Sequence, residues 1–393
     1  MLTSNSSNNT DNNTNIQSLY EIDYEQFLNK DIPAVVFLTV LSFIGIVGNV
    51  HTLLVYSMSP VMAKLTVRIF ILWLSATDLI ACVACIPFEI FDIRFSYTFS
   101  SGGACKFFRF LNHAMTLSSG GLLTAIAIER YKINNRIQTQ QNRNPCVALN
   151  IASLVVVAIS IVMSIPAFVF YGLNIKETGI SGLTGTDCTV LSEYQHMRTT
   201  GVYTGIVILL STACCVICAV VYGKILFVIC VQMKKERKDK AKSNNYQMDV
   251  SSELTSKETQ QVSTSQLNDV PSISSSLGKN VPSPVKTHKR SKYEKGRQLT
   301  ISLIVATAVS YLGYILYAST ILVKIVNPTL YKSSIRPVTG ILLRGYFINN
   351  AANPVVFCLL DNTFRTECVK LYKKTICAKC LSKTCWPMWT LFL

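Results

Sequence analysis

Between Pro33 and Lys64 the sequence contains no charged residue, and Met58-Ser59-Pro60 indicates a turn near the end of this apolar run. A helix needs about 20 apolar residues to cross the hydrocarbon layer of a membrane. Further runs of this kind follow at residues 69–90, 104–128, 146–171, 202–231, 299–323 and 335–360. A single segment in lipid must satisfy its own backbone hydrogen bonds, so we predict an all-α fold with seven transmembrane helices.

The distribution of charge predicts the orientation of these helices. Only 15% of the residues are charged and the net charge is +16, whereas soluble domains have about 25% charged residues. The basic residues gather in the loops after the first, third and fifth runs and in the C-terminal tail. These segments face the cytoplasm if the N-terminus is outside the cell, as the positive-inside rule requires. We therefore read the basic charge as topology and expect membrane lipids, not nucleic acid, as partners, because no folded basic domain is present.

The parts between the predicted helices differ in composition. Residues 1–32 form a polar tail with three glycosylation sequons, at Asn5, Asn8 and Asn12, and we expect this tail to be extracellular and glycosylated. Residues 33–233 contain helices one to five, and residues 298–361 contain helices six and seven. The segment 234–297 between them is rich in Ser, Lys and Gln and is expected to be a disordered cytoplasmic loop. Residues 362–393 form a Cys-rich cytoplasmic tail.

Polar side chains recur at one depth of the predicted bundle. Asp78 lies ten residues after Arg68, which places it about 15 Å into the membrane at the rise of an α-helix. Similar counting places five further polar residues at about the same depth: Asn49, Ser119, Asn349, Asn350 and Asn353. One carboxylate among neutral oxygens suits a small hard cation or a water network. Hydrogen bonding between helices is the equally weighted alternative.

Four motifs in order then carry a family resemblance. They are Gly48-Asn49-Val50, Leu74-Ser75-Ala76-Thr77-Asp78-Leu79, Glu129-Arg130-Tyr131 and Asn353-Pro354-Val355-Val356-Phe357. With seven spans in register, the chain from helix one to Phe364 resembles the rhodopsin-like, class A, G-protein-coupled receptors, and helix three is most similar to neuropeptide receptors. The resemblance implies a seven-helix bundle followed by a short amphipathic eighth helix, in the plasma membrane. It also implies a Na⁺ site around Asp78, Ser119, Asn349 and Asn353, and no other cofactor is expected.

The resemblance also implies a signalling site and a disulfide. A heterotrimeric G protein is the expected cytoplasmic partner, with Arg130 as the switch that meets it and Glu129 as the resting partner of that arginine. The full set expected to take part in G-protein coupling is Glu129, Arg130, Tyr131, Ile137 and Tyr222. Cys105 and Cys188 match the conserved pair at the outer side, so a bridge between them is implied. Both face an oxidising compartment in the predicted orientation.

Several positions depart from the family pattern. In helix six, Tyr314 stands for the usual tryptophan and Leu316 for the usual proline, so Gly313 is left as the residue that can supply a bend. Cys214 replaces the proline of helix five, and helix four has no tryptophan near Val156. Phe357 replaces a tyrosine and cannot donate a hydrogen bond. These departures indicate a divergent lineage and leave its activation mechanism open.

Two positions that bind ligands in other members of the family carry different residues here, and this narrows the class of ligand that we expect. Phe347 occupies the position of a retinal-binding lysine and Asn112 that of an amine-binding aspartate, so an opsin and a monoamine receptor are disfavoured. A secreted extracellular peptide fits best. Glu89 and Asp92 share a helix face and would attract a cationic ligand if they face the bundle. The alternative is that they reach the outer interface or pair with Arg94 or Arg109. The expected ligand pocket comprises Glu89, Asp92, Asn112, His113, Tyr314 and Tyr346.

The C-terminal tail contains candidate modification sites, and the sequence contains no recognisable enzyme motif. Four cysteines among lysines near the membrane are candidates for palmitoylation: Cys368, Cys377, Cys380 and Cys385. The spacing of Cys377 and Cys380 leaves zinc binding as a weaker alternative. No catalytic triad, phosphate loop or metal-hydrolase motif occurs, so an enzyme is not expected. A receptor for a small non-amine ligand, and an ion-conducting or transport protein, are the competing hypotheses.

Overall fold

A computed structural model describes residues 4–135, 145–195, 197–261, 284–327, 329, 331 and 336–380. The chain divides into two compact units. The first comprises Met1–Val221 with Gln298–Leu393, and the second is Tyr222–Arg297. The predicted spans and loops outside 222–297 all belong to the first unit.

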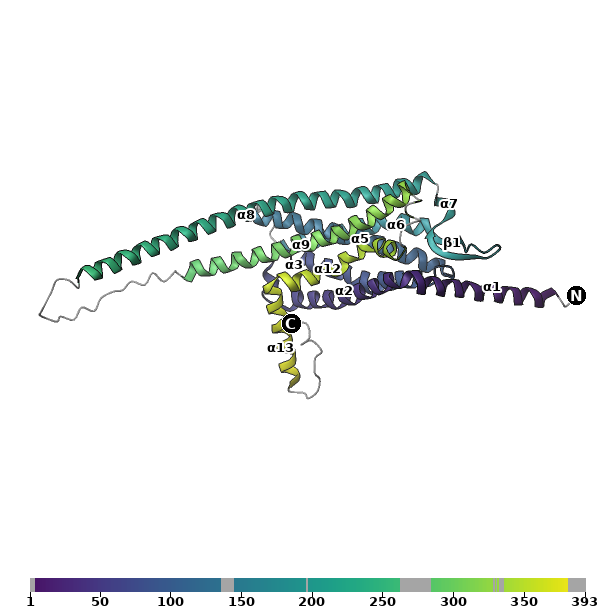
Figure 1. Ribbon diagram of the computed structural model, residues 1–393, viewed down its shortest axis with the longest axis horizontal. Helices are drawn as coiled ribbons and strands as arrows, with labels where there is room; N and C mark the ends of the chain where they lie inside the picture. The colour runs from purple at the N-terminus through teal and green to yellow at the C-terminus, as the bar shows by residue number, and fades with distance from the viewer. Residues whose placement is uncertain are drawn as a thin grey trace. The chain divides into compact units, whose positions relative to one another are not determined.

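Helices make up most of the described chain (Figure 1). In chain order the long ones begin with α1 (Ser4–Gln26), a π-helical turn η1 (Phe27–Asp31) and α2 (Ile32–Met58). We call a run of consecutive helical segments that matches one predicted span a rod. The second rod has three parts, α3 (Arg68–Ile80), a π-helical turn η3 (Ala81–Cys85) and α4 (Ile86–Arg94). Next come α5 (Gly102–Asn134), α6 (Pro145–Phe170), α8 (Arg198–Gln261) and α9 (Pro284–Val326). The last rod is α11 (Arg336–Leu342), η4 (Gly345–Phe347) and α12 (Ile348–Leu360), and α13 (Asn362–Cys380) follows it.

In the part of the chain that the structure describes, seven helical rods coincide with the seven predicted spans, and each rod contains or overlaps its predicted range. Among the described residues, five helices are long and apolar enough to cross a membrane by length and composition alone: Asn15–Met58, Arg68–Arg94, Pro145–Phe170, Arg198–Lys235 and Gly296–Val326. The two others miss that criterion for physical reasons. Helix α5 carries Lys106 and Arg109 near its start and polar residues such as Asn112 and His113 further along, and the last rod is interrupted at η4.

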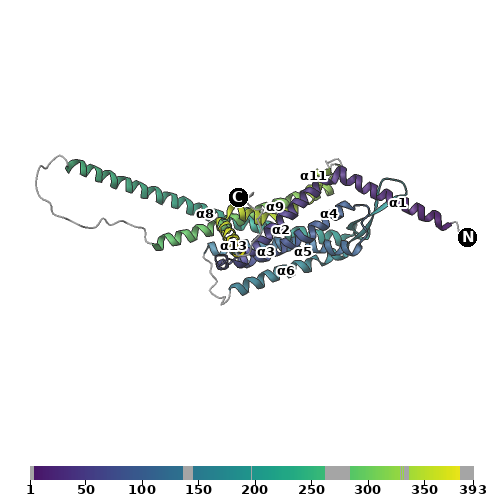
Figure 2. The same cartoon turned by 90° about the horizontal axis from the view of Figure 1, so that it is seen from below.

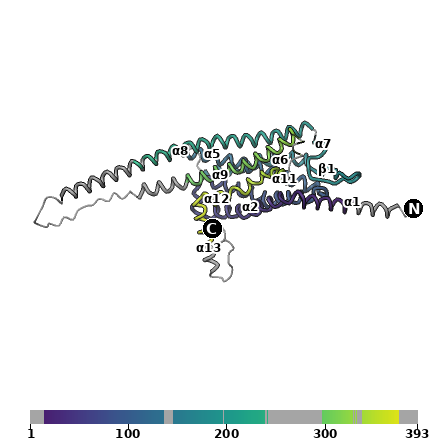
Figure 3. Tube along the Cα trace, viewed as in Figure 1, coloured from purple at the N-terminus to yellow at the C-terminus, as the bar shows by residue number. Residues whose placement is uncertain are grey.

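The rods pack around two buried apolar clusters. Helix α2 contacts α3 and α12, while α5 contacts α3 and α6 (Figure 2). The first and last rods are thus neighbours, as the purple α2 and the yellow α12 show in Figure 3. Small residues allow the close approach: a Cβ on Gly48 of α2 would lie 2.5 Å from Pro354 Cγ of α12. One cluster includes Tyr56, Leu74 and Phe357, and the other lies around Leu38 at the opposite end of α2.

A two-stranded antiparallel sheet covers one end of the bundle. Strand β1 (Tyr171–Glu177) pairs with β2 (Thr184–Val190), with Leu173 opposite Cys188. Gly179 and Gly182 in the connection have φ of 85° and 79°, a region that favours glycine because it has no Cβ. We call this the hairpin end of the bundle, and the opposite end, where α13 begins, the α13 end.

The N-terminal helix is fastened to the hairpin end by one buried carboxylate. Asp23 of α1 is 1% exposed. It accepts hydrogen bonds from Ser96 Oγ (3.2 Å), Tyr97 N (2.8 Å) and Thr98 Oγ1 (2.5 Å). Thr98 in turn forms a β-bridge with Thr186 of β2. Helix α1 passes through η1 into α2, so the predicted polar tail 1–32 is helical over Ser4–Asp31.

The segment 234–297 differs from the expected disordered loop where the structure describes it. Helix α8 continues to Gln261 and α9 begins at Pro284. Lys, Glu, Gln, Met and Ala are good helix formers, and extending an existing helix avoids the unfavourable nucleation step. The low apolar content of this segment, which suggested disorder, means that it cannot form a hydrophobic core. It does not prevent the segment from being helical. Residues 262–283 lie outside the described part of the chain.

Candidate ligand-binding and signalling sites

Asp78 is the centre of a polar network between three rods. Its carboxylate is fully buried. Oδ1 accepts hydrogen bonds from Ser119 Oγ of α5 (2.9 Å) and Asn350 Nδ2 of α12 (3.1 Å), and Oδ2 accepts one from Asn353 Nδ2 (2.8 Å). Asn349 Nδ2 donates to Ser119 Oγ at 2.6 Å. The structure therefore joins these five residues, which the sequence placed at one depth, through side-chain contacts.

Asn49 of α2 joins the same network through the backbone. Its Nδ2 donates to the carbonyl of Gly45 (2.9 Å) and to that of Asn350 (2.8 Å). The side-chain oxygens of Asn49, Asn349 and Asn353 are buried and accept no hydrogen bond. Buried oxygens without donors cost free energy unless a cation or water meets them. A carboxylate and amide oxygens are the kind of groups that coordinate a small hard cation.

The backbone is irregular directly beside this network. The π-helical turn Ala81–Cys85 begins three residues after Asp78, and Pro87 follows it. Proline has no N–H, so the helix before it loses a backbone hydrogen bond. Ser42 Oγ of α2 donates to the carbonyl of Cys82 at 2.9 Å, which satisfies one group in the irregular turn. The turn thereby fastens helix two to helix one next to the buried carboxylate.

Four charged side chains form a second site near the hairpin end. Arg109 of α5 contacts Glu89 Oε2 at 2.9 Å and Asp92 Oδ2 at 2.6 Å. Arg344 contacts Glu89 Oε1 at 3.1 Å. The side chains are 7–19% exposed, and two positive charges balance two negative ones. We call these residues the charge cluster.

In the charge cluster the carboxylates of Glu89 and Asp92 both pair with Arg109, one of the partners that the sequence suggested. Arg94, the other suggested partner, lies instead over the rings of Tyr24, Phe27 and Phe95. Arg344 was not anticipated. The available signal was its isolated positive charge inside the last apolar run, where an ionised group needs a partner.

A disulfide connects the charge cluster to the hairpin. Cys105 at the start of α5 is bonded to Cys188 of β2, so the predicted bridge is confirmed. Both cysteines pack with Phe88 and Phe99 in a small buried cluster. The carbonyl of Cys188 also accepts a hydrogen bond from Arg109 Nη2 at 3.2 Å. The hairpin is therefore held over α5 by one covalent and one charge-assisted contact.

The remaining predicted pocket residues fall into two groups. Asn112 Nδ2 donates to Tyr346 Oη at 2.8 Å, and the Tyr346 ring lies 5.1 Å from that of Tyr317. Tyr317 also contacts Tyr314, with the ring centroids 6.4 Å apart.

His113 points to another set of rings. Its centroid lies 5.8 Å from Tyr171 of β1 and 6.2 Å from Tyr203 of α8. Asn112 and His113 are thus adjacent in the sequence but serve different sides of the same helix.

At the α13 end, the Glu129-Arg130-Tyr131 triplet closes α5. Arg130 is 6% exposed. Glu129 lies 3.9 Å from Lys132 in a partly exposed pair, and such pairs contribute little to stability. Tyr222 belongs to the second unit and is described by itself, and Ile137 lies outside the described residues.

Phe357 and α13 complete the α13 end. Phe357 is fully buried, with its ring 6.3 Å from Tyr56 and 6.0 Å from Phe364. The loss of the tyrosine hydroxyl at this position therefore leaves an aromatic contact. Glu367 of α13 accepts a hydrogen bond from Ser59 Oγ at 2.7 Å, which ties α13 to the end of α2.

The modification sites are only partly described. Cys368 is half-buried and packs against the first apolar cluster. Cys385 lies outside the described residues. The side chains of the other predicted modification sites also lie outside what the structure describes: Asn5, Asn8, Asn12, Cys377 and Cys380. Among the residues that are described, no three His, Cys, Asp or Glu side chains gather into a metal site.

Comparisons with known proteins agree with this architecture. Residues 48–357 match the model of the 7 transmembrane receptor (rhodopsin family). The chain is 29% identical to the mouse neuropeptide Y receptor type 6 over 35% of its length and 36% of that protein. It is 30% identical to the zebrafish galanin receptor 2b over 36% of its length and 37% of that protein. It is also 24% identical to the bovine G-protein coupled receptor 52, over 52% of its length and 54% of that protein. The matched part spans between about a third and about half of each relative.

Proposed function

Because the chain belongs to the rhodopsin family of seven-transmembrane receptors, we propose that it is activated by a secreted peptide and signals to a heterotrimeric G protein. As a member of this family it is a multi-pass membrane receptor and not an enzyme. The observation that carries the proposal is the arrangement of the family motifs. Asn49, Asp78 and Asn353 meet in one network, and the triplet with Arg130 lies about one turn before the end of α5, at the α13 end.

The names of two relatives support a peptide ligand, since neuropeptide Y and galanin receptors are among the matches. The charge cluster supports it in another way. Its charges are already balanced, so a small cation gains little there, whereas a peptide can offer partners to the arginines and the carboxylates together. A screen of secreted peptides against cells that express the chain, with a G-protein reporter, tests the proposal. A receptor for a small non-amine ligand would respond only to non-peptide compounds, and a transporter would move ions in vesicles without any G protein.

Coupling to the G protein is assigned to Arg130 as the central residue, together with Glu129, Tyr131, Ile137 and Tyr222. Arg130→Ala should abolish activation of the reporter while surface expression persists. The matched control is Lys132→Ala, because Lys132 is a basic residue on the same turn of α5 and its side chain is 49% exposed. Full signalling by Arg130→Ala, or equal loss in the Lys132→Ala control, would contradict the assignment.

The network around Asp78 is proposed to bind Na⁺ and thereby favour the resting state. The carboxylate and the oxygens of Asn49, Asn349 and Asn353 would hold the ion. If Na⁺ favours one state, an agonist that favours the other binds more weakly in its presence, and the reverse holds by linkage.

The test compares the purified chain in NaCl and in an equal concentration of N-methyl-D-glucamine chloride, so that ionic strength is fixed. Na⁺ should raise the thermal midpoint and, once a peptide agonist is known, weaken its binding. Asp78→Asn should remove both effects. Equal midpoints in the two salts for the unaltered chain would leave Asp78 as a hydrogen-bonding contact between helices.

The proposed orientation places the N-terminus and the hairpin end outside the cell and the α13 end in the cytoplasm, at the plasma membrane. It follows from the basic residues of the loops and tail. In this orientation Asn5, Asn8 and Asn12 would carry glycans, and Cys368, Cys377, Cys380 and Cys385 would be accessible to palmitoylation. A mobility shift on glycosidase treatment, lost when the three asparagines are replaced by Gln, tests the outer location of residues 1–32.

A further inference from the structure

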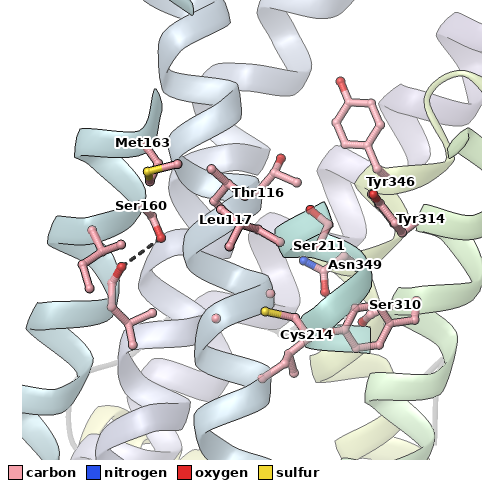
Figure 4. A pocket seen from close by; sticks show the side chains of 17 residues that line it. Thr116, Leu117, Ser160, Met163, Ser211, Cys214, Ser310, Tyr314, Tyr346 and Asn349 are labelled. Carbon is pink, nitrogen blue, oxygen red and sulfur yellow. Dashed lines mark hydrogen bonds between the residues drawn. The ribbon is translucent and has the colours of Figure 1, made fainter. Parts of the chain in front are cut away.

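Tyr56, near the end of α2, carries a hydroxyl group that is buried and has no hydrogen-bond partner among the described residues. The whole side chain is fully buried. A buried hydroxyl without a partner destabilises the arrangement in which it is found. Tyr56 does not line the cavity that Figure 4 shows, so a molecule bound in that cavity would not supply the missing partner. The partner must therefore come from elsewhere at the α13 end.

The position of Tyr56 is fixed by contacts to its backbone and to its ring. Arg68, at the start of α3, donates from Nε to the carbonyl of Tyr56 at 2.6 Å and from Nη2 to that of Ser57 at 3.2 Å. The ring centroid lies 6.3 Å from that of Phe357 and 6.0 Å from that of Phe364, and those two centroids are 6.0 Å apart. We call these three rings, from α2, α12 and α13, the aromatic triangle. A change of hydrogen-bond partner is therefore made by the groups around the ring and not by Tyr56 itself.

Two charged side chains, Arg130 of α5 and Asp361 between α12 and α13, lie close enough to act electrostatically on the Tyr56 hydroxyl. Both are buried, with 6% and 1% exposure. Oδ1 of Asp361 caps α13 by accepting hydrogen bonds from Thr363 N at 2.8 Å and Phe364 N at 3.2 Å. Oδ2 takes no part in this cap and can accept a further bond. The guanidinium of Arg130 has five N–H groups and no acceptor, so it can only donate.

A phenolic hydroxyl both donates and accepts, so it matches these two neighbours. Tyr56 Oη can donate to the carboxylate of Asp361 and accept from the guanidinium of Arg130 at the same time. Hydrogen bonds to charged groups are about twice as strong as those between neutral groups. Phe357, which stands beside Tyr56 in the aromatic triangle, has no hydroxyl and can make neither bond. The hydroxyl that position 357 lacks is thus present one ring away, on α2.

We propose that Tyr56 is a positioning residue for G-protein coupling, whose hydroxyl joins Arg130 to Asp361 when the receptor signals. The inference rests on the proposed role of Arg130 in coupling. In the described structure the hydroxyl is unpaired, and in the signalling arrangement it is paired on both sides. An interaction that is made in only one of two states shifts the equilibrium toward that state. Tyr56 therefore favours the arrangement in which Arg130 is held beside the start of α13.

The first measurement is the thermal midpoint of the purified full-length chain. Tyr56→Phe removes only the hydroxyl and keeps the ring in the aromatic triangle, so it should raise the midpoint by about 1–4 °C. Tyr372→Phe is the matched control, because Tyr372 of α13 is 37% exposed and water can satisfy its hydroxyl. Its midpoint should not change. A tyrosine whose hydroxyl is hydrogen-bonded in the folded chain would instead lose stability on this substitution, so an unchanged or lower midpoint for Tyr56→Phe would overturn the proposal.

The second measurement is the G-protein reporter signal of cells that express the chain, with the secreted peptides of the screen and without peptide, at equal surface expression. Tyr56→Phe should lower the signal about tenfold, because a hydrogen bond to charged groups is lost from the signalling arrangement alone. The double variant Tyr56→Phe with Phe357→Tyr returns a hydroxyl to the aromatic triangle and should restore most of the signal. An undiminished signal in Tyr56→Phe, or no recovery in the double variant, would overturn the proposal.

The two measurements separate failure of this inference from failure of the proposed function. The thermal midpoint requires neither a peptide nor a G protein, so a Tyr56→Phe midpoint that does not rise contradicts the inference whatever the signal. An unaltered chain that gives no reporter signal with any peptide contradicts the proposed function instead.

Discussion

The contact between Gly313 of α9 and Gly345 of η4 makes a quantitative prediction about stability. A Cβ on Gly313 would overlap the carbonyl oxygen of Gly345 and would lie 3.2 Å from Ile348 Cβ and 3.3 Å from Gly345 C. The nearest of these neighbours is backbone, which cannot rotate away as a side chain can. We therefore expect Gly313→Ala to separate helices six and seven locally and to destabilise the receptor.

The magnitude follows from comparison with Gly120→Ala. Each change replaces glycine by alanine inside a helix, which by propensity alone favours the helix by about 1 kcal/mol. That gain cancels between the two variants, and the added methyl at Gly120 meets nothing within 4 Å. The remaining difference is the overpacking cost, about 1–3 kcal/mol.

The assay is thermal unfolding of both variants, purified in the same detergent and salt. For 393 residues, an unfolding entropy of about 2.1 cal/mol/K per residue corresponds to about 1.2 °C per kcal/mol, so Gly313→Ala should melt about 1–4 °C below Gly120→Ala. The reasoning is wrong if the two variants melt together. It is also wrong if Gly313→Leu is no worse than Gly313→Ala, since a larger side chain must meet the same backbone.

Three further outcomes are expected. Asp23→Asn should lower the thermal midpoint and speed proteolysis within residues 15–31, because three hydrogen bonds to a buried carboxylate are weakened; unchanged cleavage would refute this. Cys105→Ser should lower surface expression as much as the double variant with Cys188→Ser, since both lose one bridge; additive effects would show separate roles. Burial raises the pKa of Asp187, so its contribution to stability is present below the ordinary carboxyl pKa and lost as pH rises through the folded value; Asp187→Asn should therefore be relatively more stable at neutral pH, with the difference vanishing in acid.

The sequence predicts the membrane-spanning helices well because each span needs a long apolar segment, which is easily recognised in the composition. The apolar run that begins at Pro33 is recognised by its length, and the polar residues at one depth are recognised by their spacing from charged residues. Both features can be read from one sequence. Asp78, Ser119 and Asn353 then meet as expected because neighbouring helices of fixed rise bring equal depths together.

The details that escaped prediction depend on which faces meet. Gly313 was considered as a source of bending, yet it serves as the point of close contact with Gly345. Arg344 and Glu89 are 255 residues apart in the chain, and nothing local indicates their pairing. The helices over 234–261 were missed because composition reports the presence of a core more directly than it reports a helix.

Because α1 continues through η1 into α2, a tilt of α2 displaces the N-terminal part of α1. At about 1.5 Å per residue, Tyr20 stands about 18 Å beyond Ile32 along the helix. A tilt of α2 by about 10° would therefore move a label at Tyr20 by about 3 Å, a change accessible to spin-label distance measurement. Tyr20 is 50% exposed and tolerates such a label. Because Asp23 accepts hydrogen bonds from residues 96–98, the connection between α4 and α5 moves together with α1. Motion of the first membrane helix can therefore be followed from outside the bilayer.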